Sequence, residues 1–326
     1  MLSQTRLEKN RTSRVYRDRL LQGRDLLLRW LFLVNLRLTD LVQTPLLLDA
    51  SLAEFVNYCQ HHKVQLWLVR HSVLYIQTQW RNLRHCLPRA WDCISSWSSE
   101  LPTSNRKPVP HKMLLALSVV ALSWGYEGNQ WSRLLIIFSV LVRIGFFSML
   151  RTGELLRLRV VDICVDATEQ GNVVIGIRKP KNRKFMGRNQ FALLEDRGTI
   201  AWLKWLIADL PSDCPLWPSN AAIFRSMFRR ILSRIGLDDN LLTAGCLRPG
   251  GVTFAVLEGM EVARVKFRAR WKSEASLAAY IQEAVSQQVW LGVPSNLRQR
   301  VHELVQGGAP YLSTPPSLPW RSSRFQ

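Results

Sequence analysis

The chain has 326 residues, more than the ~100–200 residues of a typical single domain, so two domains are expected. Hydrophobic residues make up 47% of the sequence, which excludes a disordered chain, and six scattered cysteines without a CxxC pair indicate neither a zinc site nor a disulfide framework. The 44 Lys and Arg against 24 Asp and Glu leave a formal net charge of +20, which favours a polyanionic partner, although charge alone leaves nucleic acid and an anionic membrane surface both open.

The sequence carries no sign of export or of membrane insertion. The N-terminus is mixed and basic and lacks the short apolar core of a signal peptide. The apolar stretch 134–150 holds Arg143 at its centre and is shorter than the ~20 residues that span a bilayer, so we interpret it as a buried helix. We therefore expect no membrane association and an intracellular protein, nuclear in a eukaryote and otherwise cytoplasmic, which also fits the scattered cysteines.

The N-terminal residues 1–35 are rich in Arg and Leu. They form either a basic arm or a helix, and both interpretations stay open. The leucines whose spacing can line one side of such a helix are Leu20, Leu21, Leu27, Leu28 and Leu31.

Residues 36–104 are expected to form a helical domain. One of its helices is predicted to begin near Asp49, with Asp49 or Ser51 as the N-cap and Glu54 completing a capping box. The stretch 99–111 concentrates Pro, Ser and basic residues, which indicates an exposed linker at the domain boundary.

Residues 105–290 are expected to form a second domain, followed by a C-terminal tail at 291–326 that is rich in Pro and Ser from Gly307 onward. Helical patterns cover residues 112–124, 132–150, 197–210 and 221–235. Residues 172–194 predict a β-hairpin, because an alternating β-branched run is followed by a basic turn with Pro and Gly and then by a second apolar run.

Two arginines of this domain lie where a phosphate group can be held. Cleaving a phosphodiester with a side-chain nucleophile requires cations around the nonbridging oxygens, and the permanent charge and fork of arginine suit that role. Arg151 follows an apolar helix, and Glu154, one helical turn later, can orient its guanidinium. Arg248 lies shortly before Gly250 and Gly251, which are expected to bring the backbone close to whatever the arginine holds. Taken alone, each arginine is also explained by an ordinary surface salt bridge.

A tyrosine near the end of the same domain supplies a candidate nucleophile. Tyr280 ends the segment RARWKSEASLAAY on an apparent helix of small and apolar residues. Taken alone, Tyr280 is also explained as a core residue. Its order and spacing after the two arginines make it a candidate for chemistry.

In this order and spacing the sequence resembles the tyrosine recombinases, including phage-type integrases and retroelement-encoded recombinases. Arg151 and Glu154 match the family's Arg-x-x-Glu motif, and residues 245–248, GCLR, match in part its His-x-Leu-Arg motif. Trp271 and Tyr280 follow at the family's spacing. Trp271 and the RPGG segment are most similar to the retroelement-like members.

The resemblance extends over residues 112–282 and implies a mainly α fold with a small antiparallel β-sheet. In such a fold, a helical core-binding domain precedes the tyrosine-recombinase catalytic domain, and the protein clamps double-stranded DNA. It implies that Tyr280 attacks a DNA phosphate to form a 3′-phosphotyrosine intermediate. Arg151 and Arg248 stabilise the transition state, and Trp271 offers an indole N–H in place of the commoner second histidine. Such a reaction cleaves and rejoins DNA strands in site-specific recombination or integration, and both a mobile-element role and a host role stay open. It requires no metal and no nucleotide cofactor.

Members of this family usually act as four DNA-bound protomers that exchange C-terminal segments, so a homo-tetramer on DNA is expected. The stretch after Tyr280, with Val289, Leu291 and Leu304, is either such an exchanged segment or packs within its own chain.

The resemblance further implies a lysine on the hairpin turn that protonates the leaving hydroxyl. We expect Lys181 in this role, with Lys179 and Lys184 as alternatives. Together with Arg183 and Arg188, the lysines Lys179 and Lys184 are expected to contact DNA. Nonspecific phosphate binding by the whole turn stays open as well.

One residue departs from the family pattern. Gly245 stands where the family usually has a histidine, and glycine offers neither a proton nor a charge. Losing one general acid or donor costs about 10²–10⁴ in rate. The sequence is therefore compatible with a slow enzyme and with a catalytically decayed, recombinase-derived DNA-binding protein.

Overall fold

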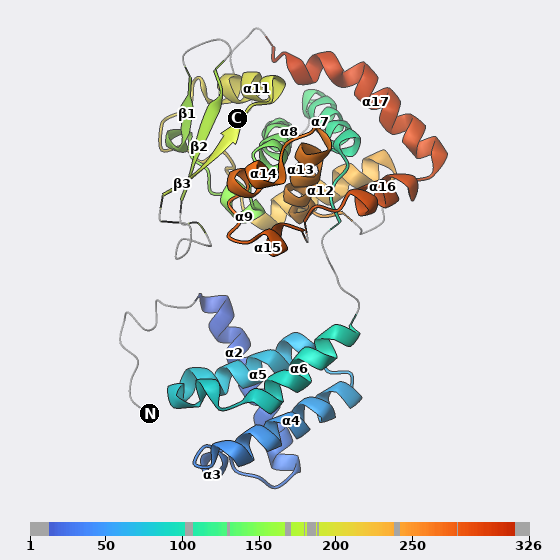
Figure 1. Ribbon diagram of the computed structural model, residues 1–326. Helices are drawn as coiled ribbons and strands as arrows, with labels where there is room; N and C mark the ends of the chain where they lie inside the picture. The colour runs from blue at the N-terminus through green and yellow to red at the C-terminus, as the bar shows by residue number, and fades with distance from the viewer. Residues whose placement is uncertain are drawn as a thin grey trace. The chain divides into compact units, whose positions relative to one another are not determined.

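The chain divides into two compact units, unit 1 (Met1–Ser104) and unit 2 (Asn105–Gln326), each with its own hydrophobic core (Figure 1). The computed structural model describes Pro180, Gly187 and residues 13–101, 107–128, 131–166, 171–178, 189–237, 242–278 and 280–316.

Unit 1 is a bundle of helices. Its elements are α2 (Arg14–Leu33), α3 (Leu38–Leu41), α4 (Pro45–His61), α5 (Leu66–Gln79), the 3-10 turn η1 (Arg81–His85) and α6 (Pro88–Glu100). Helix α2 packs on α5, and α4 packs on α6. Of the leucines predicted to share one side of a helix, Leu20, Leu27 and Leu31 are buried, whereas Leu21 and Leu28 are exposed. Residues 14–33 are therefore a helix of the core and not a frayed arm.

The helix start predicted at Asp49 is wrong. Helix α4 begins earlier, at Pro45, whose fixed φ suits a first helical turn. Asp49 is buried within α4, and its carboxylate accepts hydrogen bonds from the backbone N–H groups of Arg89 (3.0 Å) and Ala90 (3.0 Å) in the first turn of α6. Asp49 therefore caps a helix that is distant in sequence, which a local pattern cannot reveal.

Unit 2 is mainly helical. Its helices are α7 (His111–Tyr126), α8 (Ser132–Phe147), α9 (Thr152–Leu155), α11 (Arg197–Ile207), α12 (Ala221–Ile235), α13 (Leu247–Leu257), α14 (Val262–Arg268), α15 (Glu274–Ala278), α16 (Glu283–Leu291) and α17 (Ser295–Ser313), with 3-10 turns η2 (Val160–Asp162) and η3 (Ala244–Cys246). The four helices predicted in this half of the chain are confirmed, with shifts of a few residues at their ends. Helix α8 packs against α7, α11 and α13 at the centre of the unit (Figure 1).

Helix α8 accounts for the apolar stretch that carries Arg143. The helix is buried on nearly all sides, and Arg143 is buried with it. Its guanidinium Nη1 donates to the Leu312 carbonyl oxygen (2.7 Å), and its Cζ lies 5.9 Å from the centre of the Trp202 ring. Burial lowers the pKa of this guanidinium. Within the described ranges, no helix has the length and apolar character needed to cross a membrane.

The predicted β-hairpin is present and belongs to a three-stranded antiparallel sheet. The strands are β1 (Ile163–Val165), β2 (Val173–Ile177) and β3 (Gln190–Leu194), in the order β1-β2-β3. Ile175 pairs with Ile163 on one side and with Ala192 on the other. The alternating residues Val173, Ile175 and Ile177 are buried, as the period of two predicted.

The predicted Pro- and Ser-rich tail begins later than expected. Helix α17 continues through Gly307 and Pro310 to Ser313. Gly308 is needed for packing, because a Cβ atom there would lie 2.3 Å from Cγ2 of Val119 on α7. Of the residues proposed for an exchanged segment, Val289 is buried in the core of unit 2, Leu304 is partly buried against that core, and Leu291 is exposed.

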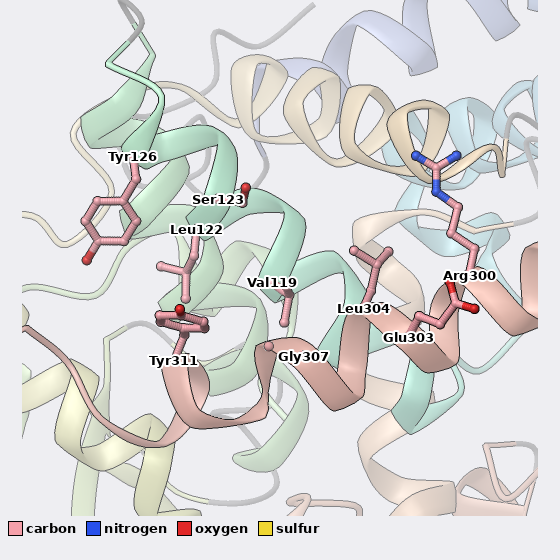
Figure 2. A pocket seen from close by; sticks show the side chains of 10 residues that line it. Val119, Leu122, Ser123, Tyr126, Arg300, Glu303, Leu304, Gly307 and Tyr311 are labelled. Atoms are coloured by element: carbon pink, nitrogen blue, oxygen red, sulfur yellow. The ribbon is translucent and has the colours of Figure 1, made fainter.

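A groove of about 760 Å³ lies between α7 and α17 (Figure 2). Leu122 and Tyr126 from α7 and Leu304 and Tyr311 from α17 supply much of its lining. The described residues that line it include neither the predicted arginines nor the predicted nucleophile.

Candidate active site

The end of α8 fixes the position of Arg151. Met149 follows the helix with φ of +52°, and the Leu150 N–H then donates to the Gly145 carbonyl oxygen (3.0 Å). This is the reversal of a Schellman motif, which ends a helix sharply. Arg151 follows at once as the N-cap of α9, with its side chain 28% exposed.

Glu154 holds Arg151 as the i,i+3 spacing predicted. Its Oε1 accepts from Arg151 Nη1 (2.7 Å), and its Oε2 accepts from the Arg151 backbone N–H (3.1 Å). Glu154 itself is 4% exposed. The guanidinium is thus held from a buried carboxylate while part of its surface faces solvent.

Arg248 lies in the first turn of α13 and is 5% exposed. Its Nη2 donates to the Ala269 carbonyl oxygen, and its Cζ lies 4.1 Å from the centre of the Trp271 ring. Its Nη1 lies 3.9 Å from Glu154 Oε2, too far for a hydrogen bond, and has no hydrogen-bond partner among the described residues. One edge of this buried cation is therefore left unsatisfied by the residues that the structure describes.

The role expected for Gly250 and Gly251 is wrong. A Cβ atom on Gly251 would lie 2.0 Å from the Phe146 carbonyl oxygen, and one on Gly250 would lie 2.5 Å from the Val109 carbonyl oxygen. The glycines therefore let α13 pack against α8 and the segment before α7. They do not bring the backbone toward a ligand.

Arg270 is a site residue that the sequence did not reveal. It follows the C-cap of α14 with φ of +59°, and the Trp271 N–H donates to the Lys266 carbonyl oxygen (3.0 Å), so α14 also ends in a Schellman motif. Arg270 is 4% exposed, and its Nη2 donates to Glu154 Oε2 (2.9 Å). The one feature of the sequence that could have pointed to Arg270 is an arginine directly after a helix C-cap, where glycine is usual.

Trp271 and Tyr280 lie beside Arg248. Their ring centres are 4.7 Å apart, with an angle of 57° between the ring planes. The Thr253 hydroxyl on α13 donates to the Tyr280 carbonyl oxygen (3.1 Å). Helix α13 thus supplies Arg248 and also positions the backbone of the candidate nucleophile.

The site combines three guanidinium groups with one buried carboxylate. Burial favours the neutral acid at Glu154, but attraction from Arg270 and Arg151 outweighs burial, so the pKa of Glu154 is lowered. Burial, followed by repulsion from Arg151 and Arg270, lowers the pKa of Arg248. Arginine stays protonated at neutral pH, so the cluster carries an excess of positive charge that suits an anion.

Gly245 lies next to this cluster, in the 3-10 turn η3 that directly precedes α13. The hydroxyl of Thr152, the neighbour of Arg151, donates to the Ala244 carbonyl oxygen (3.1 Å). This bond ties η3 to the turn that carries Arg151. The position that the resemblance assigns to a histidine therefore lies beside both predicted arginines.

The structure brings together Arg151, Arg248, Trp271 and Tyr280, which are far apart in the sequence. The basic residues of the hairpin turn lie outside the described residues: Lys179, Lys181, Arg183, Lys184 and Arg188. In the part of the chain that the structure describes, no group of three or more His, Cys, Asp or Glu side chains is arranged to hold a metal ion.

The mainly helical architecture with a small antiparallel sheet is the fold of the tyrosine recombinases, as the sequence resemblance implied. One similar solved structure is that of the XerH site-specific recombinase bound to palindromic difH substrate, in a post-cleavage complex. It matches 74% of this chain and 70% of that chain, with a TM-score of 0.52 and 14% sequence identity. This match shows the fold.

Two further solved structures are similar at lower TM-scores. A pre-cleavage complex of XerH with difH matches with a TM-score of 0.48 and 17% identity, over 73% of this chain and 69% of that chain. XerA recombinase matches with a TM-score of 0.42 and 15% identity, over 87% of this chain and 94% of that chain. No protein-family model matches the chain, and no curated protein matches it significantly.

Proposed function

We propose that this protein cleaves and rejoins DNA strands through a 3′-phosphotyrosine intermediate, with Tyr280 as the nucleophile. The observation that carries the proposal is the convergence of Arg151, Arg248, Trp271 and Tyr280 around one buried carboxylate. Among the described residues, one hydrogen-bonding edge of Arg248 has no partner. A DNA phosphate supplies the negative charge that this cluster lacks.

The chemistry follows from the residue types. The Tyr280 hydroxyl oxygen bonds to phosphorus and loses its proton, while the bond from phosphorus to the 5′ oxygen breaks and that oxygen takes up a proton. Arg151 and Arg248 stabilise the charge on the nonbridging oxygens, and the Trp271 indole N–H is a further donor. Lys181 is the proposed acid for the leaving 5′-hydroxyl. Attack by a 5′-hydroxyl of another strand reverses these steps and rejoins the DNA, without a metal or nucleotide cofactor.

The partner in this proposal is double-stranded DNA, in keeping with the formal net charge of +20. The solved structures of similar fold include a recombinase bound to its DNA substrate. We propose a homo-tetramer on DNA, acting in recombination or integration of a retroelement-like mobile element, and an intracellular location where such DNA is present.

A second candidate is a catalytically decayed DNA-binding protein, and Gly245 is the observation that favours it. Such a protein would bind DNA with a steep dependence on salt and would form no covalent intermediate on any substrate. Strand cleavage separates the two candidates, whereas DNA binding does not.

The test is incubation with nicked suicide DNA substrates, from which the cleaved end is lost so that a covalent intermediate accumulates. Covalent protein–DNA adducts are expected for the unmodified protein and for Tyr311→Phe, which removes an exposed hydroxyl from α17. Tyr280→Phe is expected to bind DNA and form no adduct. Adducts that persist in Tyr280→Phe exclude Tyr280 as the nucleophile, and DNA binding without adducts in the unmodified protein favours the second candidate.

A further inference from the structure

Arg270 occupies a backbone position that usually belongs to glycine. Its φ of +59° lies in the left-handed region, which is unfavourable for a residue with a Cβ atom. Strained residues of this kind persist where their surroundings hold them, and they concentrate at functional sites. Asn35, Lys63 and Met149 share this backbone region, so φ alone assigns no role, and the contacts of the buried Arg270 side chain must decide.

The Arg270 side chain occupies one oxygen of Glu154. Oε2 of Glu154 accepts from Arg270 Nη2 (2.9 Å) and from the backbone N–H of Arg151 (3.1 Å), while Oε1 accepts from Arg151 Nη1 (2.7 Å). A carboxylate oxygen has two lone pairs, so Oε2 has no remaining capacity for a strong hydrogen bond.

Arg248 is the cation that Glu154 would otherwise attract. Its Nη1 lies 3.9 Å from Oε2 and has no hydrogen-bond partner among the described residues, although Arg248 is 5% exposed. A buried cation next to a carboxylate normally closes onto it in a charge-assisted hydrogen bond. Here Arg270 already holds the oxygen that Arg248 faces.

We propose that Arg270 is a positioning residue that keeps Arg248 available to the DNA phosphate by occupying Glu154 Oε2. The inference rests on the proposed function and deepens it. Without Arg270, Arg248 closes onto Glu154, and the phosphate loses one of its two guanidinium ligands. Arg270 acts through Glu154 and Arg248 and does not touch the substrate itself.

The test begins with Arg270→Gly, which suits the left-handed backbone and so preserves the end of α14. Lys63→Gly is the matched control, because Lys63 follows α4 in the same motif with φ of +54° and the substitution also removes one positive charge. Adduct formation should fall about 10²-fold in Arg270→Gly, with DNA affinity changed less than about 3-fold, and should be unchanged in Lys63→Gly. Adduct formation that is unchanged in Arg270→Gly overturns the proposal.

Removing the charge of Glu154 distinguishes positioning from other roles. In the Glu154→Gln background, Arg248 has no carboxylate to close onto, so adding Arg270→Gly should lower adduct formation by less than about 3-fold. An equal loss in both backgrounds overturns the proposal, because Arg270 would then contact the phosphate directly or merely support the fold.

A measurement that does not depend on cleavage separates this inference from the proposed function. The Tm shifts caused by Arg248→Gln and Glu154→Gln should be clearly more non-additive when Arg270→Gly is also present than in the unmodified protein. If the unmodified protein forms no adducts, the proposed function fails while this comparison still decides the role of Arg270. Equal additivity with and without Arg270→Gly overturns the inference.

Discussion

Arg248→Lys keeps a positive charge in the site and removes the guanidinium geometry. The guanidinium donates to the Ala269 carbonyl oxygen, lies 4.1 Å from the centre of the Trp271 ring and directs Nη1 toward a region without a described hydrogen-bond partner. A lysine ammonium is a compact point charge and cannot reproduce all three features at once. The substitution therefore separates the effect of charge from that of the planar fork.

The expected losses of stability and of cleavage rate in Arg248→Lys follow from these contacts. Loss of a buried hydrogen bond to a charged donor costs about 1.5–3 kcal/mol, and loss of a buried cation–π contact costs about 1–2 kcal/mol. Lysine recovers part of each, so the free energy of unfolding should fall by about 2 kcal/mol. Loss of one preorganised donor to the phosphate should lower the cleavage rate by about 10²–10³-fold, or about 3–4 kcal/mol in the transition state.

The assay is single-turnover adduct formation on a suicide substrate, with DNA affinity and thermal unfolding measured on the same preparation. Arg234→Lys is the matched control, because Arg234 also pairs with a carboxylate, Glu127 (3.0 Å), and stacks on an indole ring, that of Trp124, but at an exposed position. That variant should cleave at the unmodified rate. A rate for Arg248→Lys within about 3-fold of the unmodified protein, or a rate loss no larger than the loss of DNA affinity, refutes the assignment of Arg248 to the phosphate.

Three further substitutions test other parts of the account. Gly245→His should raise adduct formation by up to about 10²-fold, because an imidazole would then lie beside the turn of Arg151. An unchanged rate would show that another group already supplies the proton or the hydrogen bond of that histidine. Gly251→Ala should lower the free energy of unfolding by about 3 kcal/mol in a denaturant titration, because its Cβ atom would lie 2.0 Å from the Phe146 carbonyl oxygen. A loss below about 1 kcal/mol would show that α13 can move away. Asp49→Ala should cost about 1–2 kcal/mol in the unfolding of unit 1 and leave cleavage unchanged, since the carboxylate caps α6, and a variant of unmodified Tm would contradict that role.

Much of unit 2 was predictable because its signals are local. The apolar run around Arg143 predicted a buried helix, the period of two in Val173, Ile175 and Ile177 predicted a strand, and the spacing of Arg151 and Glu154 predicted their ion pair. Each of these features depends on residues within one or two turns of the chain. The resemblance then placed Arg248 and Tyr280 in the same site, which local patterns alone cannot do.

The errors arose where a distant partner decides a residue's role. Gly250 and Gly251 are suited to close approach, but the sequence does not say that the approaching group is α8. Asp49 looked like a local cap and caps α6 instead. Gly308 resembled part of a loose tail, whereas contact with α7 requires glycine there within a helix.

Arg270 shows the same limitation at the site itself. Its left-handed backbone is a local feature of the end of α14, whereas its bond to Glu154 depends on that end meeting α9, which is far away in the sequence. Propensity alone favours glycine at this position. An arginine in that place is a signal only when its partner is known.

In the proposed reaction, Tyr280 becomes joined to the 3′ phosphate of cleaved DNA. The most direct measurement is mass spectrometry of the adduct formed on a suicide substrate, after digestion of both the protein and the DNA. One modified peptide is expected, with a 3′-linked nucleotide on the Tyr280 hydroxyl. A nucleotide on any other residue, or a linkage through a 5′ phosphate, would contradict it.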